Sequence, residues 1–351
     1  MKKNNYKILA VSTEKSLNIG DYVQALASKQ FLPSFHGFIE REELKEYNGD
    51  ECNMIMNGWY MHDPSQWPPS NKIKPLFLAF HINASVEEQM LSPNSIAYLK
   101  QYEPIGCRDR RTCNLLLQNN IDAYYSGCMT LTLGYKYKTT DCDGKYFFVD
   151  AYAELPKGLK SILKSILHLF LHPTKVACII KKYPKQTQHL YGKILKASYF
   201  HYEYSKLFSQ DILNNAYYIC QQSPQYKETY KTNEALLDCA ENLVKTYAKA
   251  KLVVTSRIHC ALPCLGLETP VLYIHNKQGN KLDDCRLEGI LDLFNVIEWE
   301  NGHLKRPIFL KDAKINKNTI ITNKENWRQI ANNLIIKCKN WIKICETNEN
   351  E

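Results

Sequence analysis

The sequence predicts an α/β fold of two Rossmann-like domains, each with a parallel sheet, that face each other across a cleft. Short apolar and β-branched runs alternate with helical patterns along most of the chain, as in parallel sheets with crossover helices. Polar or charged residues directly follow several of these runs, which is where ligands bind in such sheets. With 351 residues, 44% of them hydrophobic, the chain can form two cores.

The stretch 251–274 shows this alternation most clearly. Residues 252–255 and 271–274 have the composition of buried parallel strands, and the residues between them form a helix. Ser256 is the expected N-cap of this helix, and Gly266 is its expected end. Pro263 would lie in the helix interior, where the missing backbone donor should kink it.

Ser256, Arg257 and His259 lie where this strand changes to a helix. Free backbone N–H groups and the helix dipole favour an anion at such a place. Arginine suits bidentate capture of phosphate or carboxylate, and histidine can carry a proton near neutral pH. A second interpretation fits the same residues, namely a capped helix with a solvated arginine and a structural histidine.

Two strand ends in the first part of the chain repeat this arrangement. A strand over residues 6–12 is followed by the turn Asn18-Ile19-Gly20-Asp21 and a helix from Tyr22, so Asp21 is either a site carboxylate or only a cap. Arg108 follows residues 104–107 and precedes a helix over 112–119. The alternative for Arg108 is a solvated ion pair with Asp109, which would contribute little.

Aromatic residues and one histidine mark the next candidates. Trp59 follows a strand over 52–56, and Trp67-Pro68-Pro69 forms a rigid loop that could contact the face of a sugar. Packing of both tryptophans against the domain is the commoner role and remains open. His81 ends a strand over 75–80, where a site residue and a structural histidine fit equally well.

The remaining elements complete two α/β series. Helices are expected over 88–102, 234–249 and 326–347, and strands over 121–125, 145–150, 216–220 and 296–299. Arg286, in the polar loop 280–286, could reach the same cleft. The polar linker 138–144 divides an N-terminal domain (1–140) from a C-terminal one (141–325), which residues 326–351 follow as a terminal helix.

Residues 155–184 interrupt the second series. Ile162, Leu163, Ile166, Leu167 and Phe170 share one helical face, with Lys157, Lys160 and Lys164 distributed around it. A core helix and an interfacial helix on an anionic membrane surface both fit this pattern.

Composition bounds the function classes. The net charge of +9 comes from residues spread through the chain without a nucleic-acid motif, which indicates anionic small substrates or lipid surfaces rather than nucleic acid. None of the 13 cysteines forms a C-x2-C pair, and Cys260 and Cys264 lack partners at metal-ligand spacing. The basic N-terminus with its short apolar run suits a first strand better than a signal peptide, so a cytoplasmic protein is expected.

Three motifs, in the order in which they occur along the chain, resemble those of a known family. Asn18-Ile19-Gly20-Asp21, Arg108-Asp109 and Ser256-Arg257-Ile258-His259 resemble motifs of the polysaccharide pyruvyl transferase family, over roughly residues 6–300. Two facing α/β domains of this kind form a GT-B-like architecture. Pro263, the Trp67 loop and the 155–184 insertion depart from the plainer family pattern.

The resemblance implies transfer of pyruvate from phosphoenolpyruvate to two hydroxyls of one sugar, forming a cyclic ketal and releasing phosphate. It implies no cofactor or metal, and an acceptor such as galactose, carried on a lipid at the inner face of the membrane during surface or capsular polysaccharide synthesis. Together with the arguments from the residues above, the expected roles are as follows: His259 and Asp21 catalytic; Arg257, Arg108, Ser256 and Arg286 donor-binding; Asn18, Trp59, Trp67 and His81 acceptor-binding.

Two other functions also fit the sequence. A GT-B-type glycosyltransferase with a nucleotide-sugar donor would share the fold, since fold does not fix function. A non-catalytic protein that binds anionic saccharides would need the basic cleft without a proton carrier, and would tolerate replacement of His259.

Overall fold

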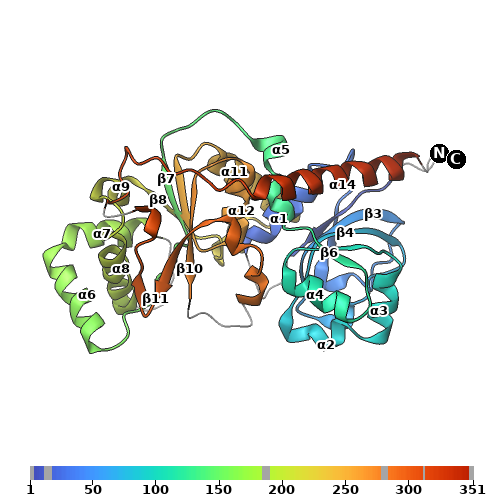
Figure 1. The fold of residues 1–351 in the computed structure, drawn as a ribbon, viewed down its shortest axis with the longest axis horizontal. Coiled ribbons are helices and arrows are strands. Elements are labelled where there is room, and N and C mark those ends of the chain that lie inside the picture. Colours follow the sequence, from blue (N-terminus) through green and yellow to red (C-terminus); the bar gives the residue numbers. More distant parts are fainter. Residues whose placement is uncertain (1–3, 12–17, 184–189, 278–283, 311–312, 348–351) are drawn as a thin grey trace.

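The computed structural model describes residues 4–11, 18–183, 190–277, 284–310 and 313–347. Over these residues the predicted α/β class is confirmed, with parallel sheets and surrounding helices (Figure 1). Parts of three predicted segments lie outside the described residues. They are residue 12 of the first strand, residue 184 of the insertion and residues 280–283 of the polar loop.

The first sheet is parallel throughout. Its strands are β1 (Ile8–Ala10), β2 (Phe38–Glu40), β3 (Cys52–Tyr60), β4 (Ile73–Ile82), β5 (Ile105–Cys107) and β6 (Ala123–Tyr125). The pair β1-β2 lies beside the group β3-β4-β5-β6, because the backbone N–H of Lys7 donates to the Asn53 carbonyl at 3.1 Å. With the isolated parallel bridge between Tyr6 and Asn53 joining the pair to the four-stranded group, the strand order is β2-β1-β3-β4-β5-β6.

The second sheet has the order β12-β11-β10-β9-β7-β8, and only its short edge strand β12 is antiparallel. Its strands are β7 (Tyr146–Val149), β8 (Tyr217–Ile219), β9 (Leu252–Thr255), β10 (Val271–Asn276), β11 (Asn295–Glu300) and β12 (His303–Leu304). The predicted strands over 145–150, 216–220, 252–255, 271–274 and 296–299 are thus confirmed to within a few residues.

The helices connect and cover these strands. They are α1 (Ile19–Lys29), α2 (Glu87–Met90), α3 (Pro93–Lys100), α4 (Arg110–Gln118), α5 (Gly134–Tyr137), α6 (Leu159–Leu171), α7 (Pro173–Lys182), α8 (Leu190–Tyr204), α9 (Gln210–Asn215), α10 (Gln225–Thr229), α11 (Asn233–Ala248), α12 (Ile258–Gly266) and α14 (Trp327–Thr347). The single helix predicted over 88–102 is wrong. It is two helices, because Pro93 has no backbone donor and starts a new one.

Each sheet has one point where the strand order reverses. In the first sheet it lies between β1 and β3, and in the second between β7 and β9. Ligands bind outside the carboxyl ends of strands at such points. Asp150 directly follows β7 and Ser256 directly follows β9, while α1 is the next described element after β1.

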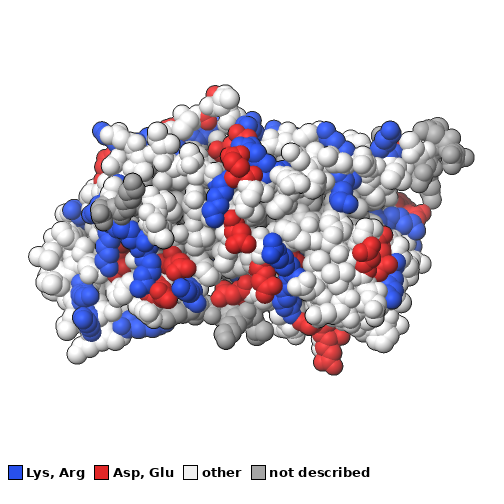
Figure 2. All heavy atoms as spheres, viewed as in Figure 1, with Lys and Arg blue, Asp and Glu red and all other residues white. Residues whose placement is uncertain are grey.

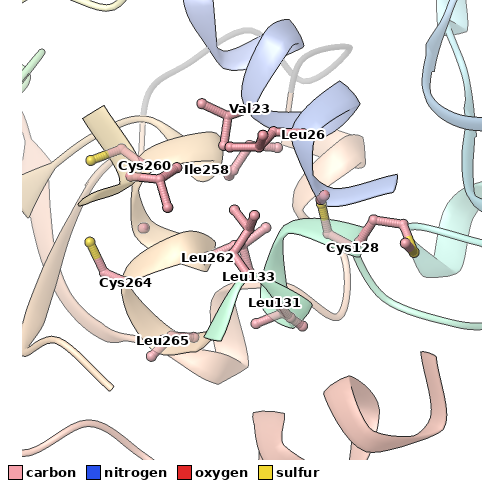
Figure 3. Close-up of a cluster of buried hydrophobic side chains, with 14 of the residues drawn as sticks. Val23, Leu26, Cys128, Leu131, Leu133, Ile258, Cys260, Leu262, Cys264 and Leu265 are labelled. Carbon is pink, nitrogen blue, oxygen red and sulfur yellow. The ribbon is translucent and has the colours of Figure 1, made fainter. Parts of the chain in front are cut away.

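One apolar cluster spans both sheets. Val23 and Leu26 of α1 pack with Ile258 and Leu262 of α12 and with Leu131 of the turn 129–132 (Figure 3). α1 also packs against α11, and α14 reaches this cluster through its own buried residues. Two further clusters lie within the first and the second sheet regions.

The contact between α12 and the 129–134 region requires glycine on both sides. A Cβ on Gly134 would lie 1.9 Å from the Gly266 carbonyl oxygen, and one on Gly266 would lie 2.3 Å from the Leu131 carbonyl oxygen. Both distances are far below van der Waals contact, so larger residues would push α12 away from the first half of the chain. α12 ends at Gly266, as predicted.

Candidate active site

A pocket of about 210 Å³ lies at these strand ends and collects residues from both sheets. It is lined by Asn18, Asp21, Arg41, Trp59, His62, Arg108, Gln221, Gln222, Ser256, Arg257, Ile258, His259, Tyr273 and Arg286. All the predicted site residues except Trp67 and His81 are in this set. The volume is below the roughly 300–1,000 Å³ of sites for drug-sized ligands, which suits a small metabolite.

The start of α12 differs from the prediction for Ser256. Arg257 occupies the N-cap position without a side-chain cap, and the Ser256 hydroxyl donates to the Asp150 carbonyl at 2.5 Å. The predicted N-cap role of Ser256 is therefore wrong, because its hydroxyl is committed to the neighbouring strand end. The helix continues through Pro263, and the His259 carbonyl freed by the proline accepts from the Gln221 amide at 3.5 Å.

Arg257 is held by two partners on the second sheet. Its Nε donates to Asp150 Oδ2 at 3.1 Å, and its Nη2 donates to Gln222 Oε1 at 2.9 Å. Asp150 Oδ2 also accepts from the Gln221 backbone N–H at 2.9 Å. The guanidinium is thus fixed at the pocket wall, while a carboxylate offsets part of its charge.

Arg108 and Arg286 carry the unpartnered cationic donors of the pocket. The Arg108 side chain is 1% exposed, which excludes the alternative of a solvated surface pair. Among the described residues, Nε and Nη2 of Arg108 and Nε of Arg286 are buried without a hydrogen-bond partner. Buried charged donors are costly to leave unpaired, so the arrangement is suited to an anion that accepts from them.

His259 lies beside these arginines, on the first turn of α12. Its Nε2 is buried without a partner in the described structure, and its Cβ lies 3.0 Å from where a Cβ on Gly20 would be. Burial, and then the charges of Arg108 and Arg286, hold the pKa of His259 well below 6.5. The imidazole is therefore neutral at pH 7 and can accept a proton.

Asp21 faces the pocket from the first turn of α1. The cap of this helix is Asn18, whose Oδ1 accepts from the Gly20 backbone N–H at 3.1 Å, so the alternative of Asp21 as a mere cap is wrong. Asp21 Oδ1 instead accepts from the Gln24 amide at 3.2 Å. Burial raises the pKa of Asp21 above 3.8, with Arg41 and Arg108 opposing it, and this favours the protonated form.

Trp59 forms an aromatic side of the same pocket. Arg41 lies over its ring with the guanidinium carbon 4.9 Å from the ring centroid, and the His62 ring lies 4.6 Å away. Arg41 Nε also pairs with Glu42 at 2.8 Å. The indole is therefore braced by a cation and an imidazole at the pocket edge.

Trp67 is placed in the core and not at the pocket. It is 5% exposed and packs against the rings of Tyr60, Phe77, Phe80 and Tyr98. Buried in this way, it cannot contact a sugar, so its predicted acceptor-binding role is wrong. The packing role that the sequence left open is the one the structure supports.

His81 is buried outside the set of pocket-lining residues. Its Nδ1 lies 2.5 Å from Asp109 Oδ2, and Asp109 Oδ1 accepts from the Thr112 backbone N–H at the start of α4. Burial and Arg108 lower the pKa of His81 to about 4, while the hydrogen bond from His81 helps to lower the pKa of Asp109. A neutral His81 donating to an ionised Asp109 holds the segment that carries Arg108.

Besides Ile258, which lies within the quoted motif, five of the pocket residues were not predicted. Gln221 and Gln222 follow the predicted strand over 216–220, so the strand-end argument could have found them. Tyr273 lies inside a strand, and its hydroxyl donates to the Ser256 carbonyl at 3.1 Å. Arg41 and His62 lie in a short 3₁₀ turn and a loop, which have no sequence signal of this kind.

Comparison with protein-family models gives a match. The family model described as polysaccharide pyruvyl transferase matches residues 18–278, which include every pocket residue except Arg286. A search of curated proteins gives no match. Within the described residues, no group of three or more histidine, cysteine, aspartate or glutamate side chains is placed to hold a metal ion. With the model covering most of its length, the chain belongs to the polysaccharide pyruvyl transferase family.

Proposed function

We propose that the protein transfers pyruvate from phosphoenolpyruvate to two hydroxyls of one sugar, forming a cyclic ketal and releasing phosphate. The observation that carries this proposal is the meeting of unpartnered Arg108 and Arg286 donors with the free Nε2 of a neutral His259 in one small pocket. The family supports a transferase that acts on polysaccharide.

Phosphoenolpyruvate suits the charges of this pocket. It carries a phosphate and a carboxylate, and the free nitrogens of Arg108 and Arg286 can donate to them, with Arg257 beside them. The donor's negative charge would oppose the part of the His259 pKa shift that comes from the arginines. Donor binding would then make His259 a stronger base without moving it.

The reaction needs two proton transfers before phosphate leaves. Protonation of the donor methylene makes C2 electrophilic, a sugar hydroxyl adds to C2, and its proton is removed. The second hydroxyl then attacks C2, the bond from C2 to the phosphate oxygen breaks, and phosphate departs with the remaining proton. His259 is the base for the hydroxyl because its lowered pKa keeps it neutral, and Asp21 is the acid because its raised pKa favours the protonated form.

The acceptor sugar would lie against Trp59, with Asn18 nearby. Aromatic faces stack on the apolar side of a sugar ring, and Arg41 braces the indole for this purpose. In this proposal the first sheet binds the acceptor, and the second sheet binds the donor together with Arg108 from the first, as in a GT-B-like enzyme. The acceptor is a sugar such as galactose on a lipid carrier, and the enzyme works at the cytoplasmic side of the membrane.

The test is a donor and acceptor screen. The protein is incubated with phosphoenolpyruvate and with free or lipid-linked sugars, and the products are examined by mass spectrometry and phosphate release. A mass gain of one pyruvic acid less one water, with one phosphate per product, is expected. Nucleotide-sugars serve as competing donors, and glycosyl transfer from them without pyruvyl transfer would refute the proposal.

Two variants test the roles in the pocket. His259→Gln should lower kcat by about 10²–10⁴-fold with little change in donor KM, as loss of a proton carrier does. Asp21→Asn should do the same and remove the alkaline limb of the pH profile, since the acid must be protonated. Wild-type turnover in His259→Gln would instead favour a protein that only binds saccharides.

A further inference from the structure

Helix α6 exposes several large apolar side chains and buries two polar residues. Leu159, Leu163 and Leu167 recur every four residues along one face and are 74%, 56% and 60% exposed, and Phe170 beside them is 76% exposed. Ser165 and His168, on the opposite face, are buried. A surface helix of a globular domain normally turns its apolar face inward, so this face is unpartnered in the described chain.

Polar bonds to α8 fix α6 in this orientation. The Ser165 hydroxyl donates to the Leu195 carbonyl at 3.0 Å, and the Ser198 hydroxyl donates to the Ser165 carbonyl at 2.7 Å. His168 Nε2 lies 2.7 Å from His201 Nδ1. Rotating α6 to bury its leucines would break all three contacts and leave buried polar groups unpaired.

The apolar surface continues onto the start of α8. The start of α8 lies near the residues that precede α6, because a Cβ on Gly192 would lie 4.0 Å from Leu155 Cδ2. Leu190 and Tyr191 therefore lie near the Leu159 end of α6, and they are 72% and 70% exposed. We call the exposed side chains of six residues the docking face: Leu159, Leu163, Leu167, Phe170, Leu190 and Tyr191.

The sequence stretch that contains this face is rich in lysine. Residues 155–202 contain nine lysines and neither aspartate nor glutamate, so they account for the whole net charge of +9. The other 36 lysines and arginines are spread through the rest of the chain, as expected, and 36 aspartates and glutamates balance them there. Figure 2 shows white and blue atoms over the outermost surface at the α6 end of the molecule.

The insertion also projects away from the rest of the fold. It joins β7 to β8 and lies at the end of the molecule far from the first sheet (Figure 1). In the described ranges no single helix is long and apolar enough to cross a membrane, and α6 and α7, which reach that limit together, are bent by 101°. With a polar inner face and this bend, α6 is suited to lie along a surface.

We propose that the docking face binds an anionic membrane surface, with α6 lying in the interface. Its leucines and Phe170 enter the boundary between headgroups and acyl chains, and lysines such as Lys160 and Lys164 contact the anionic headgroups. The two contributions act together and give reversible attachment. Membrane binding of this kind does not depend on which reaction the pocket catalyses.

The experiment is flotation of the full chain with vesicles of phosphatidylcholine alone and of phosphatidylcholine with an equal part of phosphatidylglycerol. Binding is expected only to the anionic vesicles, and high salt should weaken it by screening the lysines. Lys160→Gln with Lys164→Gln should weaken binding about 25-fold, at about fivefold per lysine. Leu163→Gln, Leu167→Gln and Phe170→Ser together should abolish it.

Matched controls come from exposed residues elsewhere. Ile308→Gln with Ile320→Gln removes side chains that are 96% and 86% exposed, and Lys314→Gln with Lys317→Gln removes two exposed lysines. Both controls should bind as the wild type does, and circular dichroism should show every variant folded. Absence of binding to anionic vesicles, equal loss in the controls, or dimerisation of the wild type through the leucines in light scattering would overturn the proposal.

Discussion

Arg108 should limit the stability of the empty protein while it supports donor binding. Two of its guanidinium nitrogens are buried without partners, and Asp109 lies 3.9 Å from Nε. A buried unsatisfied polar group costs about 1–3 kcal/mol. Arg108→Met fills similar space with a flexible apolar side chain, so we expect the free energy of unfolding to rise by about 1–3 kcal/mol.

The same variant should lose donor affinity. At about 2.1 cal/mol/K of unfolding entropy per residue, this stabilisation raises the Tm of the empty 351-residue chain by roughly 1–4 °C. Two hydrogen bonds from a charged donor contribute about 1.5–3 kcal/mol each, so the Kd for phosphoenolpyruvate should rise by roughly 10²–10⁴-fold. Scanning calorimetry without ligand and titration calorimetry with the donor measure the two effects.

A surface arginine provides the control. Arg328 pairs with Glu268 and Glu325 and is 42% exposed on its side chain, so Arg328→Met should leave donor affinity unchanged and should not raise Tm. If Arg108→Met lowers Tm or binds the donor like the wild type, the unpartnered guanidinium is not reserved for an anion.

Three further predictions concern packing and pH. Gly20→Ala places a Cβ 3.0 Å from the Cβ of His259 and should displace the imidazole, so kcat should fall by about tenfold or more while Tm changes little. An unchanged kcat would show that this contact does not set the imidazole position. Trp67→Ala should lower the free energy of unfolding by about 3–5 kcal/mol in urea titration, and a change below 1 kcal/mol would contradict its place in the core. Burial lowers the pKa of both His168 and His201 to about 4, whereas the pKa is near 6.5 in the unfolded chain, so the unfolded chain binds protons first as pH falls. The contribution of the two neutral histidines to the free energy of unfolding is therefore fully present above pH 6.5 and is lost as pH falls towards 4. In His201→Gln the urea midpoint should decline less steeply over this range.

Strand ends were the part of the site that the sequence could predict. Arg108, Arg257 and His259 each follow an apolar run, and parallel strands bring such residues to one edge regardless of their separation in the chain. Arg41 and His62 reach the pocket through a 3₁₀ turn and a loop. Their positions depend on tertiary packing, which no local pattern encodes.

Burial of individual side chains was the part that could not be predicted. The proline-rich loop around Trp67 suggested exposure, but four aromatic rings of the first sheet region surround the indole. In α6 the amphipathic pattern was evident, yet the pattern alone does not say which face points inward. Hydrogen bonds from Ser165 and His168 to α8 decide that question.

The apolar cluster that α1 and α12 share determines whether the two halves of the chain can be exchanged with those of a relative. Val23 and Leu26 of one half interdigitate with Ile258 and Leu262 of the other, and Gly134 and Gly266 meet backbone to backbone. In a chimera that joins the first half of this chain to the second half of a relative, the side chains at this central interface would therefore not fit each other. Under the acceptor site proposed above, new acceptor specificity is better sought by substituting the residues around Trp59 than by exchanging whole halves.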